Sequence, residues 1–470
     1  MFNKTKIIAT IGPSTNHPHL INKLIKNGMN VARLNMAHKS TDKDIENLVK
    51  NIRNEASKLN RHVGILMDIA GPKIRVDLSY LAGDKIEITK NHVYTLGFSK
   101  MNDISINVDL NFKKINDSKA FVKIDDGKIS FKIISVSNNI LKIKSIDDGE
   151  IFSNKGVNFP GVDLEVPSLT ENDKKNIMLG EKLNIDWFAL SFVRSAEDFN
   201  DFTSQFKNDK CRIPVIAKIE KPEAIENLDS IINVFDGVLI ARGDLGVEMS
   251  LSKLPVLQKT IIEKCRLQMK PVIIATQMLE SMVTKSIPTR AEVNDVANAV
   301  FDQVDAVMLS GETAVGEYPV ETVKIMSDII LNVENEFSDN VKIDRNKKLD
   351  CPRYAIAKAV KTISENLKID SIVVMTESGA TSKLVSYFRP NMNIYSMSPS
   401  IEVCNKMSLL WGIISLKVDN YLSTDEMLLN AKKNLLEKEF MKTGQTFVMT
   451  AGVPVGITGS TNMLKIEKID

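Results

Sequence analysis

Short apolar runs alternate with helix-like segments along the chain up to about residue 335. Eight runs have the length and near-continuous apolar character of parallel strands that are buried on both faces. They cover residues 6–11, 31–36, 63–68, 187–192, 215–219, 237–241, 271–275 and 305–309. Seven of the eight intervals after these runs hold helix-forming segments, as expected of βαβ units. Eight alternations predict an α/β fold built on a closed (β/α)8 TIM barrel.

The interval after the third run departs from this rhythm. Between Pro72 and Asp163 there is little helical periodicity, and alternating stretches occur at 85–89, 120–124 and 141–146. Asp-Gly pairs at 126–127 and 148–149 supply turn signals between them. We therefore predict a small β-barrel lid domain over residues 72–163, inserted at the mouth of a catalytic barrel formed by 1–71 and 164–337.

The chain becomes polar after residue 337, which predicts a linker. A second α/β set follows, and we predict a C-terminal regulatory domain over 345–470. Its expected helices cover 352–367 and 382–388, and its expected strands cover 371–375, 413–418, 446–450 and 463–466.

Composition excludes several classes of protein. The 470 residues suffice for two or three domains, and 61 basic against 59 acidic residues favour neither nucleic acid nor membrane as a partner. We find no run of about 20 apolar residues, and the N-terminus lacks the layout of a signal peptide. The four cysteines lie far apart and form no CxxC pair, which indicates reduced thiols and a cytoplasmic location.

Charged and hydroxyl residues follow nearly every predicted strand. They are Arg33, Asn35, Asp68, Lys218, Glu220, Arg242, Asp244, Thr276, Ser310 and Glu312. In a (β/α)8 barrel these positions line one mouth, where chemistry gathers. The five histidines all lie between His17 and His92, so a metal would be held by carboxylates, which suits Mg²⁺. Carboxylates, a lysine and arginines on one rim favour phosphoryl transfer.

Each of these residues also has a structural interpretation. A lone charge at a strand end is commonly a solvated loop residue. Glu220 could pair with Lys218 or Lys221, and Asp244 could cap the helix that follows it. The functional interpretation is favoured only because the residues occur together on one rim.

At these same positions the sequence resembles the pyruvate kinase family. The matching stretches are 5–14, 28–35, 155–158, 218–220, 241–246, 275–282, 308–314 and 452–456. The stretch ATQMLESM at 275–282 is the most specific, and the resemblance covers nearly the whole chain. It implies transfer of the phosphoryl group of phosphoenolpyruvate to ADP, giving pyruvate and ATP as the final step of glycolysis. It further implies dependence on Mg²⁺ (or Mn²⁺) and a homotetramer.

The resemblance also assigns roles to residues. Glu220 and Asp244 would bind Mg²⁺, while Lys218 and Arg33 would hold the phosphoryl group. The backbone amides of Gly243 and Asp244 would bind the substrate carboxylate together with Thr276. Thr276 would also relay a proton through water. The residues expected at the nucleotide phosphates are Asn35, His38, Arg75 and Lys155.

The chain departs from the family at one cation site. Many members hold K⁺ there with a Ser, an Asn, an Asp and a Thr, and carry a Glu nearby. Here Ala37 and Ile69 supply no side-chain oxygen, and Lys73 replaces the Glu. A lysine ammonium is a compact +1 charge, so we hypothesise that Lys73 replaces K⁺ and that K⁺ is not required. The alternative is a solvated lysine at the lid hinge.

A hydroxyl-rich loop in the C-terminal domain contains Thr376, Ser378, Thr381 and Ser382. Such a loop at a helix start can bind phosphate, and in the family this region binds allosteric effectors. A sugar monophosphate or AMP is the expected ligand, because Glu377 disfavours a doubly phosphorylated sugar. Helix capping without a ligand is the alternative, and the sequence leaves both open.

Two other functions fit part of this pattern. A Mg²⁺-dependent carbon–carbon lyase would share Glu220 and Asp244, but it would have no use for Arg75, Lys155 and a lid. A non-catalytic regulatory relative would not need to keep Arg33 and Lys218.

Overall fold

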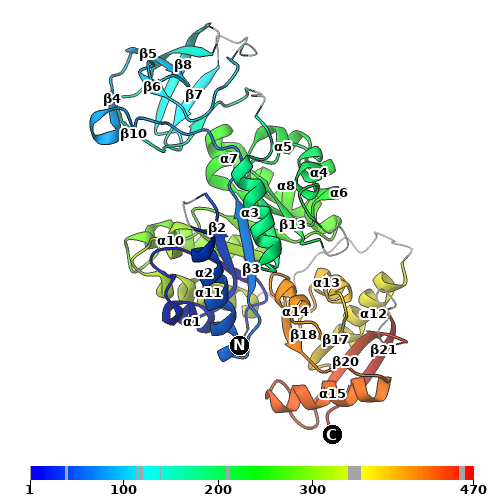
Figure 1. The fold of residues 1–470 in the computed structure, drawn as a ribbon. Helices are drawn as coiled ribbons and strands as arrows, with labels where there is room; N and C mark the ends of the chain where they lie inside the picture. Colours follow the sequence, from blue (N-terminus) through cyan, green and yellow to red (C-terminus); the bar gives the residue numbers. More distant parts are fainter. Residues whose placement is uncertain are drawn as a thin grey trace.

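The eight predicted strands form one closed parallel barrel. The computed structural model describes residues 2–37, 41–112, 115, 120–137, 139–162, 164, 166–207, 212–336, 351–454 and 461–470. Within these residues, the barrel lies between an inserted β domain and a C-terminal α/β domain (Figure 1). The predicted fold class is confirmed, whereas the predicted linker, between residues 337 and 345, lies outside the described residues.

The barrel strands have the order β1-β16-β15-β14-β13-β12-β3-β2. Their bounds are β1 Lys6–Ile11, β2 Met29–Asn35, β3 Gly64–Ile69, β12 Trp187–Leu190, β13 Val215–Ile219, β14 Gly237–Ala241, β15 Val272–Ala275 and β16 Ala306–Leu309. Each bound lies within two residues of its predicted position. The near-continuous burial of these strands explains their unbroken apolar sequence.

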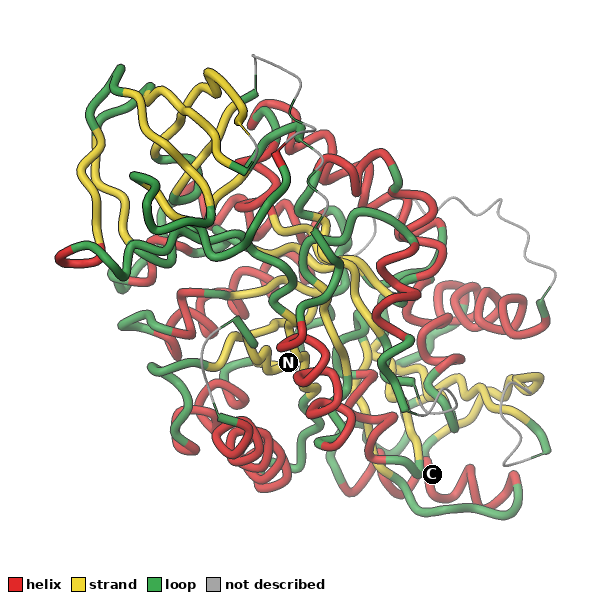
Figure 2. Tube along the Cα trace, turned by 45° about the horizontal axis from the view of Figure 1, so that its top comes forward, coloured by secondary structure: helices red, strands yellow, loops and turns green. Residues whose placement is uncertain are grey.

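Helices surround the barrel strands as an outer layer (Figure 2). Their bounds are α1 Pro18–Lys26, α2 Asp42–Lys58, α3 Glu171–Lys182, α4 Glu197–Thr203, α5 Pro222–Glu226, α6 Leu228–Val234, α7 Arg242–Glu248, α8 Leu254–Leu267, α9 Arg290–Phe301, α10 Gly311–Ala314 and α11 Pro319–Glu336. Capping boxes start α2, α3 and α9, where a threonine hydroxyl and an acidic side chain satisfy the first free amides. Among the described helices, none combines the length and apolar character that a membrane crossing needs.

The inserted domain contains two antiparallel-rich sheets around its own apolar core. A six-stranded sheet has the order β11-β7-β8-β9-β5-β6, and β10 pairs with β4. The bounds are β4 Lys85–Ile88, β5 Val93–Gly97, β6 Ile104–Ser105, β7 Phe121–Ile124, β8 Ile129–Ser137, β9 Ile140–Ser145, β10 Gly149–Phe152 and β11 Val157–Asn158. Arg75 bridges to Gly156 beside β11, and Val76 bridges to Ile106 beside β6. Residues 75 and 76 therefore link the two edge strands of the sheet, β11 and β6, and curl the sheet toward a barrel.

The C-terminal domain is a five-stranded sheet of order β19-β18-β17-β20-β21, in which only β21 is antiparallel. Its elements are α12 Pro352–Asn366, β17 Ser371–Met375, α13 Ala380–Tyr387, β18 Asn393–Ser398, α14 Ile401–Met407, β19 Ile413–Lys417, α15 Thr424–Glu437, β20 Thr446–Gly452 and β21 Thr461–Lys468. The sequence did not predict β18, α14 or α15. For β18 the reason is that Ser396 and Ser398 are fully buried, which hides the apolar pattern of a strand.

The C-terminal domain closes the amino end of the barrel. Leu409 is fully buried and packs in the cluster of inward-facing barrel residues that includes Ile8 and Leu66. The Trp187 indole N–H donates to the carbonyl of Lys406 at 3.0 Å, and the Arg389 guanidinium pairs with Asp305 at 3.1 Å. The opposite, carboxyl end of the barrel is therefore the one left free for chemistry.

Candidate active site

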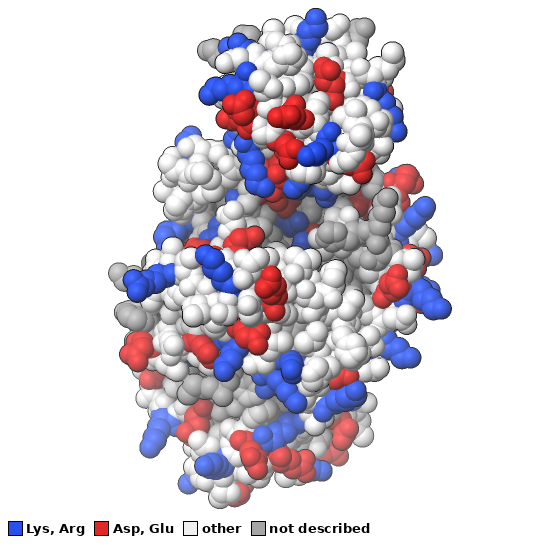
Figure 3. Space-filling model, turned by 90° about the vertical axis from the view of Figure 1, so that its left-hand side faces the viewer, with Lys and Arg blue, Asp and Glu red and all other residues white. Residues whose placement is uncertain are grey.

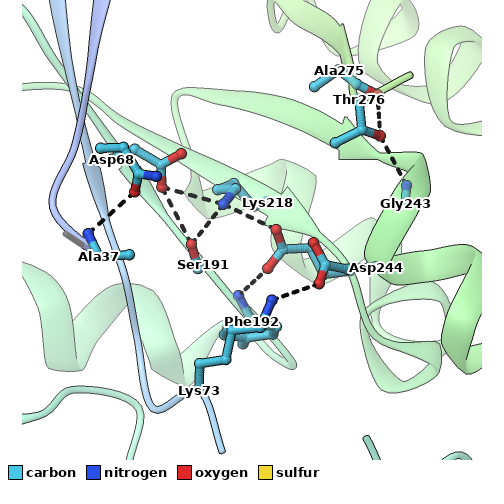
Figure 4. Close-up of polar contacts among 12 residues, drawn as sticks. Ala37, Asp68, Lys73, Ser191, Phe192, Lys218, Gly243, Asp244, Ala275 and Thr276 are labelled. Atoms are coloured by element: carbon cyan, nitrogen blue, oxygen red, sulfur yellow. Dashed lines mark hydrogen bonds and ion pairs between the residues drawn. The ribbon is translucent and has the colours of Figure 1, made fainter. Parts of the chain in front are cut away.

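Two cations and two carboxylates meet at the carboxyl ends of β2, β3 and β13, and Figure 4 shows Lys218 and Asp68 of this group. The Lys218 Nζ lies 3.2 Å from Asp68 Oδ1 and 3.0 Å from Glu220 Oε1. The Arg33 Nη2 lies 2.7 Å from Asp68 Oδ2, and its Nη1 donates to the Thr10 hydroxyl at 2.9 Å. Asp68 and Glu220 are each only 1% exposed. The four charged groups predicted at three strand ends thus form one buried cluster.

The charges in this cluster control one another. Burial disfavours ionisation of Asp68, but Lys218 and Arg33 outweigh burial and lower its pKa. Burial likewise opposes the charge of Lys218, yet Asp68 and Glu220 raise its pKa. The pKa of Glu220 is raised by burial despite the nearby Lys218, and Asp244 adds to the rise. The negative charge of Asp68 is therefore balanced by Lys218 and Arg33. Glu220 and Asp244, in contrast, can together bind a further positive charge.

Ser191 and Phe192 complete the surroundings of Lys218 (Figure 4). The Lys218 ammonium donates to Ser191 Oγ at 2.7 Å, and the Phe192 amide donates to Glu220 Oε2 at 2.8 Å. Phe192 adopts a left-handed φ of 58°, which is uncommon for an aromatic residue. Neither residue was predicted from the sequence. Ser191 lies at the end of a predicted strand, so the strand-end rule could have found it, but a backbone amide has no sequence signal.

Lys73 lies beside the second predicted metal ligand. Its Nζ is 3.1 Å from Asp244 Oδ1, and the two side chains are 26% and 23% exposed. Asn35 Oδ1 accepts from the Ala37 amide at 3.2 Å. Both oxygens of Asp68 already contact side-chain cations. Lys73 thus places its charge next to Asp244 rather than next to Asp68.

Gly243 and Thr276 contact each other directly. The Gly243 amide donates to Thr276 Oγ1 at 2.8 Å, and this hydroxyl donates to the carbonyl of Ala275 at 2.6 Å. The amide expected to bind a carboxylate therefore already has an oxygen partner. A Cβ added at Gly243 would lie 3.6 Å from Thr276, which is ordinary contact. The protein's own packing consequently does not require glycine here.

The predicted nucleotide residues fall in two groups. Asn35 lies at the end of β2 near Arg33. In the inserted domain, the Lys155 Nζ lies 2.8 Å from Asp125 Oδ1, and the Arg75 Nη1 donates to the carbonyl of Asn154 at 2.8 Å. These two side chains are thus engaged locally rather than with the cluster around Lys218. His38 lies outside the described residues.

A cavity of about 880 Å³ opens beside Arg33, between the end of β1, α2 and the α10 region. Its lining includes Gly12, Arg33, Asn35, Asn47 and Ser310. A space-filling view also shows a hollow between the inserted domain and the barrel, with charged side chains on its walls (Figure 3). The mouth therefore offers room for a ligand larger than a three-carbon acid.

A metal at this mouth would have few protein ligands. In the described part of the chain, no group of three or more His, Cys, Asp or Glu side chains is arranged to hold a metal ion. Glu220 and Asp244 are hard oxygen donors whose charges repel each other. Mg²⁺ commonly binds to one or two carboxylates and takes its other ligands from water and substrate oxygens. The two carboxylates fit such an ion.

The hydroxyls of the predicted effector loop are mostly used inside the domain. Thr376 Oγ1 accepts from the Gly379 amide at 3.0 Å, and the Thr381 and Thr461 hydroxyls are 2.5 Å apart. The Ser382 hydroxyl bonds to Ser396, and Ser378 is exposed. Three of the four hydroxyls are therefore engaged inside the domain, although none of them caps α13, whose N-cap is Gly379 without a side-chain cap bond.

The barrel and its charged mouth define the class of protein: a (β/α)8-barrel enzyme. The family model described as "Pyruvate kinase, barrel domain" matches residues 2–323, and "Pyruvate kinase, alpha/beta domain" matches residues 354–467. The chain belongs to the pyruvate kinase family.

Similar proteins span nearly the whole chain. A pyruvate kinase of Sporosarcina psychrophila is 38% identical over 99% of this chain and 80% of its own length. Pyruvate kinase 2 of Synechocystis is 39% identical over 99% of this chain and 79% of its own. A crystal structure of a pyruvate kinase from Cryptosporidium parvum superposes with a TM-score of 0.90 at 31% identity, covering 100% of this chain and 96% of that one.

Proposed function

We propose that this enzyme transfers the phosphoryl group of phosphoenolpyruvate to ADP and releases pyruvate and ATP. The observation that carries the proposal is the Lys218 ammonium, held 3.2 Å from Asp68 and 3.0 Å from Glu220 at the carboxyl end of the barrel. Membership of the pyruvate kinase family supports the same reaction. The bond between phosphorus and the enol oxygen breaks, and a β-phosphate oxygen of ADP forms the new bond.

Arg33 and Lys218 are the groups that neutralise the transferring phosphoryl group. Asp68 holds both cations by its two oxygens, so neither has to be oriented during the reaction. The Gly243 and Asp244 amides at the start of α7 bind the substrate carboxylate with Thr276. The Thr276 hydroxyl then passes a proton, through water, to the terminal carbon of the enolate, which becomes the methyl group of pyruvate.

Glu220 and Asp244 are the residues that would hold Mg²⁺ or Mn²⁺, because they are adjacent hard ligands. When bound, such an ion neutralises charge on the phosphoryl and enolate oxygens. Asn35 and the cavity beside Arg33 would take the nucleotide. Arg75, Lys155 and His38 would bind its phosphates, which requires the first two side chains to leave Asn154 and Asp125.

Lys73 supports independence from K⁺. Its ammonium supplies a fixed positive charge 3.1 Å from Asp244, and both Asp68 oxygens already contact cations. Activity in Na⁺, K⁺ and tetramethylammonium salts at one ionic strength tests this. We expect rates within about twofold of each other, and a large activation by K⁺ would refute the hypothesis.

A coupled assay of pyruvate formation tests the reaction itself. We expect pyruvate only when phosphoenolpyruvate, ADP and Mg²⁺ are all present, with ATP formed in equal amount. Pyruvate formed without ADP would favour a different barrel chemistry. No pyruvate under any condition would favour a regulatory relative without activity.

The proposal extends to the oligomeric state, the domain boundaries and the effector of the enzyme. We propose a homotetramer in the cytoplasm, with a barrel from 1–71 and 164–337, a lid from 72–163 and a regulatory domain from 345–470. For the loop of Thr376, Ser378, Thr381 and Ser382 we propose a sugar monophosphate or AMP as effector. Titration of AMP, glucose 6-phosphate and fructose 1,6-bisphosphate against activity tests this, and no response to any would favour a purely structural role for the loop.

A further inference from the structure

The turn after β15 has an unfavourable backbone conformation. Thr276 has a φ of 66° and Gln277 a φ of 56°, so two consecutive residues with side chains are left-handed. A β-branched residue rarely adopts this region, because its side chain crowds the backbone there. Surrounding contacts must therefore hold the turn, which places Thr276 opposite Gly243 at the mouth.

Arg242 supplies these contacts. Its Nη2 donates to the carbonyl of Thr276 at 2.8 Å and approaches the sulfur of Met278 at 2.9 Å. The guanidinium is itself oriented by Asp295 on α9, whose two oxygens lie 2.7 Å from Nη1 and Nη2. A planar guanidinium fork can make all these contacts at once, which a lysine cannot.

Arg242 and its contacts with Asp295 and the Thr276 carbonyl, here called the Arg242 clamp, join three segments of the barrel. Arg242 begins α7 and immediately precedes Gly243, whose amide donates to Thr276 Oγ1. One side chain thus connects α7, the turn after β15 and α9. The Arg242 Nε is buried and has no hydrogen-bond partner among the described residues. An unsatisfied buried donor is costly, so the arrangement is not the one that would maximise stability.

We propose that Arg242, oriented by Asp295, is a positioning residue that fixes the Thr276 hydroxyl opposite the start of α7. The proposal rests on the proposed function, in which Thr276 binds the substrate carboxylate and relays the proton. The clamp acts through Thr276 and does not itself touch substrate.

A double-mutant cycle tests the proposal. We expect Asp295→Asn and Arg242→Lys each to lower kcat by about tenfold, because the Thr276 turn relaxes. In a Thr276→Ala background, which lacks the hydroxyl, we expect the same substitutions to cost less than about twofold. Asp236→Asn is the matched control, since Asp236 makes a two-contact pair with Arg212 (2.7 and 3.0 Å) at the amino end of the barrel. It should change unfolding but not kcat.

Proton exchange provides a second readout that a purely structural role would not move. In D2O, exchange of the methyl protons of pyruvate, followed by NMR, should fall in parallel with kcat in Asp295→Asn and Arg242→Lys. The Thr276→Ala variant is also measured alone, because its kcat is the baseline for the second half of the cycle. Losses of equal size in both backgrounds would overturn the proposal. If the unmodified enzyme forms no pyruvate from phosphoenolpyruvate and ADP, the proposed function fails instead.

Discussion

The two ends of the barrel use ion pairs in opposite ways. At the amino end, an aspartate precedes each of β12, β14 and β16. Asp186 pairs with Arg53 at 2.6 Å and accepts the Ile65 amide at 2.7 Å. Asp236 and Asp305 repeat this arrangement with the Arg212 and Arg389 guanidiniums and the amides of Val215 and Val272.

At the carboxyl end, side chains of the same charge lie close to one another. Glu220 faces Asp244 as well as Lys218, and Lys218 is repelled by Arg33. Left-handed backbone does not distinguish the two ends, because it occurs at Phe192 and Thr276 here and at Asn184 and Gln303 before β12 and β16. The amino-end aspartates each join one arginine to one strand amide, which stabilises the barrel. The carboxyl end instead keeps closely spaced like charges, whose repulsion ligand binding can relieve.

The largest expected effect is on activity, at the carboxyl end. Lys218→Met should lower kcat by about 10³-fold or more, or about 4 kcal/mol, because the phosphoryl group loses its neutralising ammonium. Steady-state kinetics measure this, with circular dichroism as the check on folding. Normal turnover in a folded Lys218→Met variant would show that the charges at the carboxyl end are not needed for activity.

The next effect is on stability, at the amino end. Asp305→Ala should lower the free energy of unfolding by about 3 kcal/mol, because Arg389 is left buried and unpaired. Urea unfolding measures the loss. The kcat of the folded fraction should be unchanged, and a loss of kcat without a loss of stability would contradict the assignment.

Lys6 makes the amino end sensitive to pH. Burial lowers the pKa of Lys6 to about 8, although Glu334 opposes the shift, while its ammonium donates to the carbonyl of Ile413 at 2.8 Å. Between pH 8 and the ordinary value of 10.5 the unfolded chain binds more protons, so stability rises with pH across this window. Relative to Lys6→Met, the unmodified enzyme should gain about 2 kcal/mol from about pH 7.5 to about pH 10. Urea unfolding midpoints of both proteins at both pH values measure the difference in the free energy of unfolding. A larger stability advantage at the lower pH would contradict the prediction.

The smallest expected effect tests whether Gly243 contacts the ligand or only packs against the protein. Gly243→Ala should raise KM for phosphoenolpyruvate about tenfold but change the stability by less than about 0.5 kcal/mol, because its Cβ meets only ordinary contact. Gly316→Ala is the matched control, since its Cβ would lie 2.3 Å from the carbonyl oxygen of Glu312. There we expect the reverse, with lost stability. Equal destabilisation of both variants would show that Gly243 is a packing residue.

Much of the site was predictable because strand order along the chain fixes which residues share a barrel end. Arg33, Asp68, Lys218 and Glu220 are each predicted as polar residues at a strand end, and the structure brings them into contact. The three aspartates before β12, β14 and β16 carry the same kind of signal at the other end, but they were not predicted as a repeat.

The sequence by itself determined the class of fold and the charged groups that cluster around Lys218, because apolar periodicity and strand-end position are local properties. Only the tertiary structure decided how the charges pair: that Lys73 lies at Asp244, that Lys155 lies at Asp125, and that Arg242 holds the Thr276 turn. The physical reason is that these pairings join segments far apart in the chain. Their energies depend on distance and burial, which no local pattern encodes.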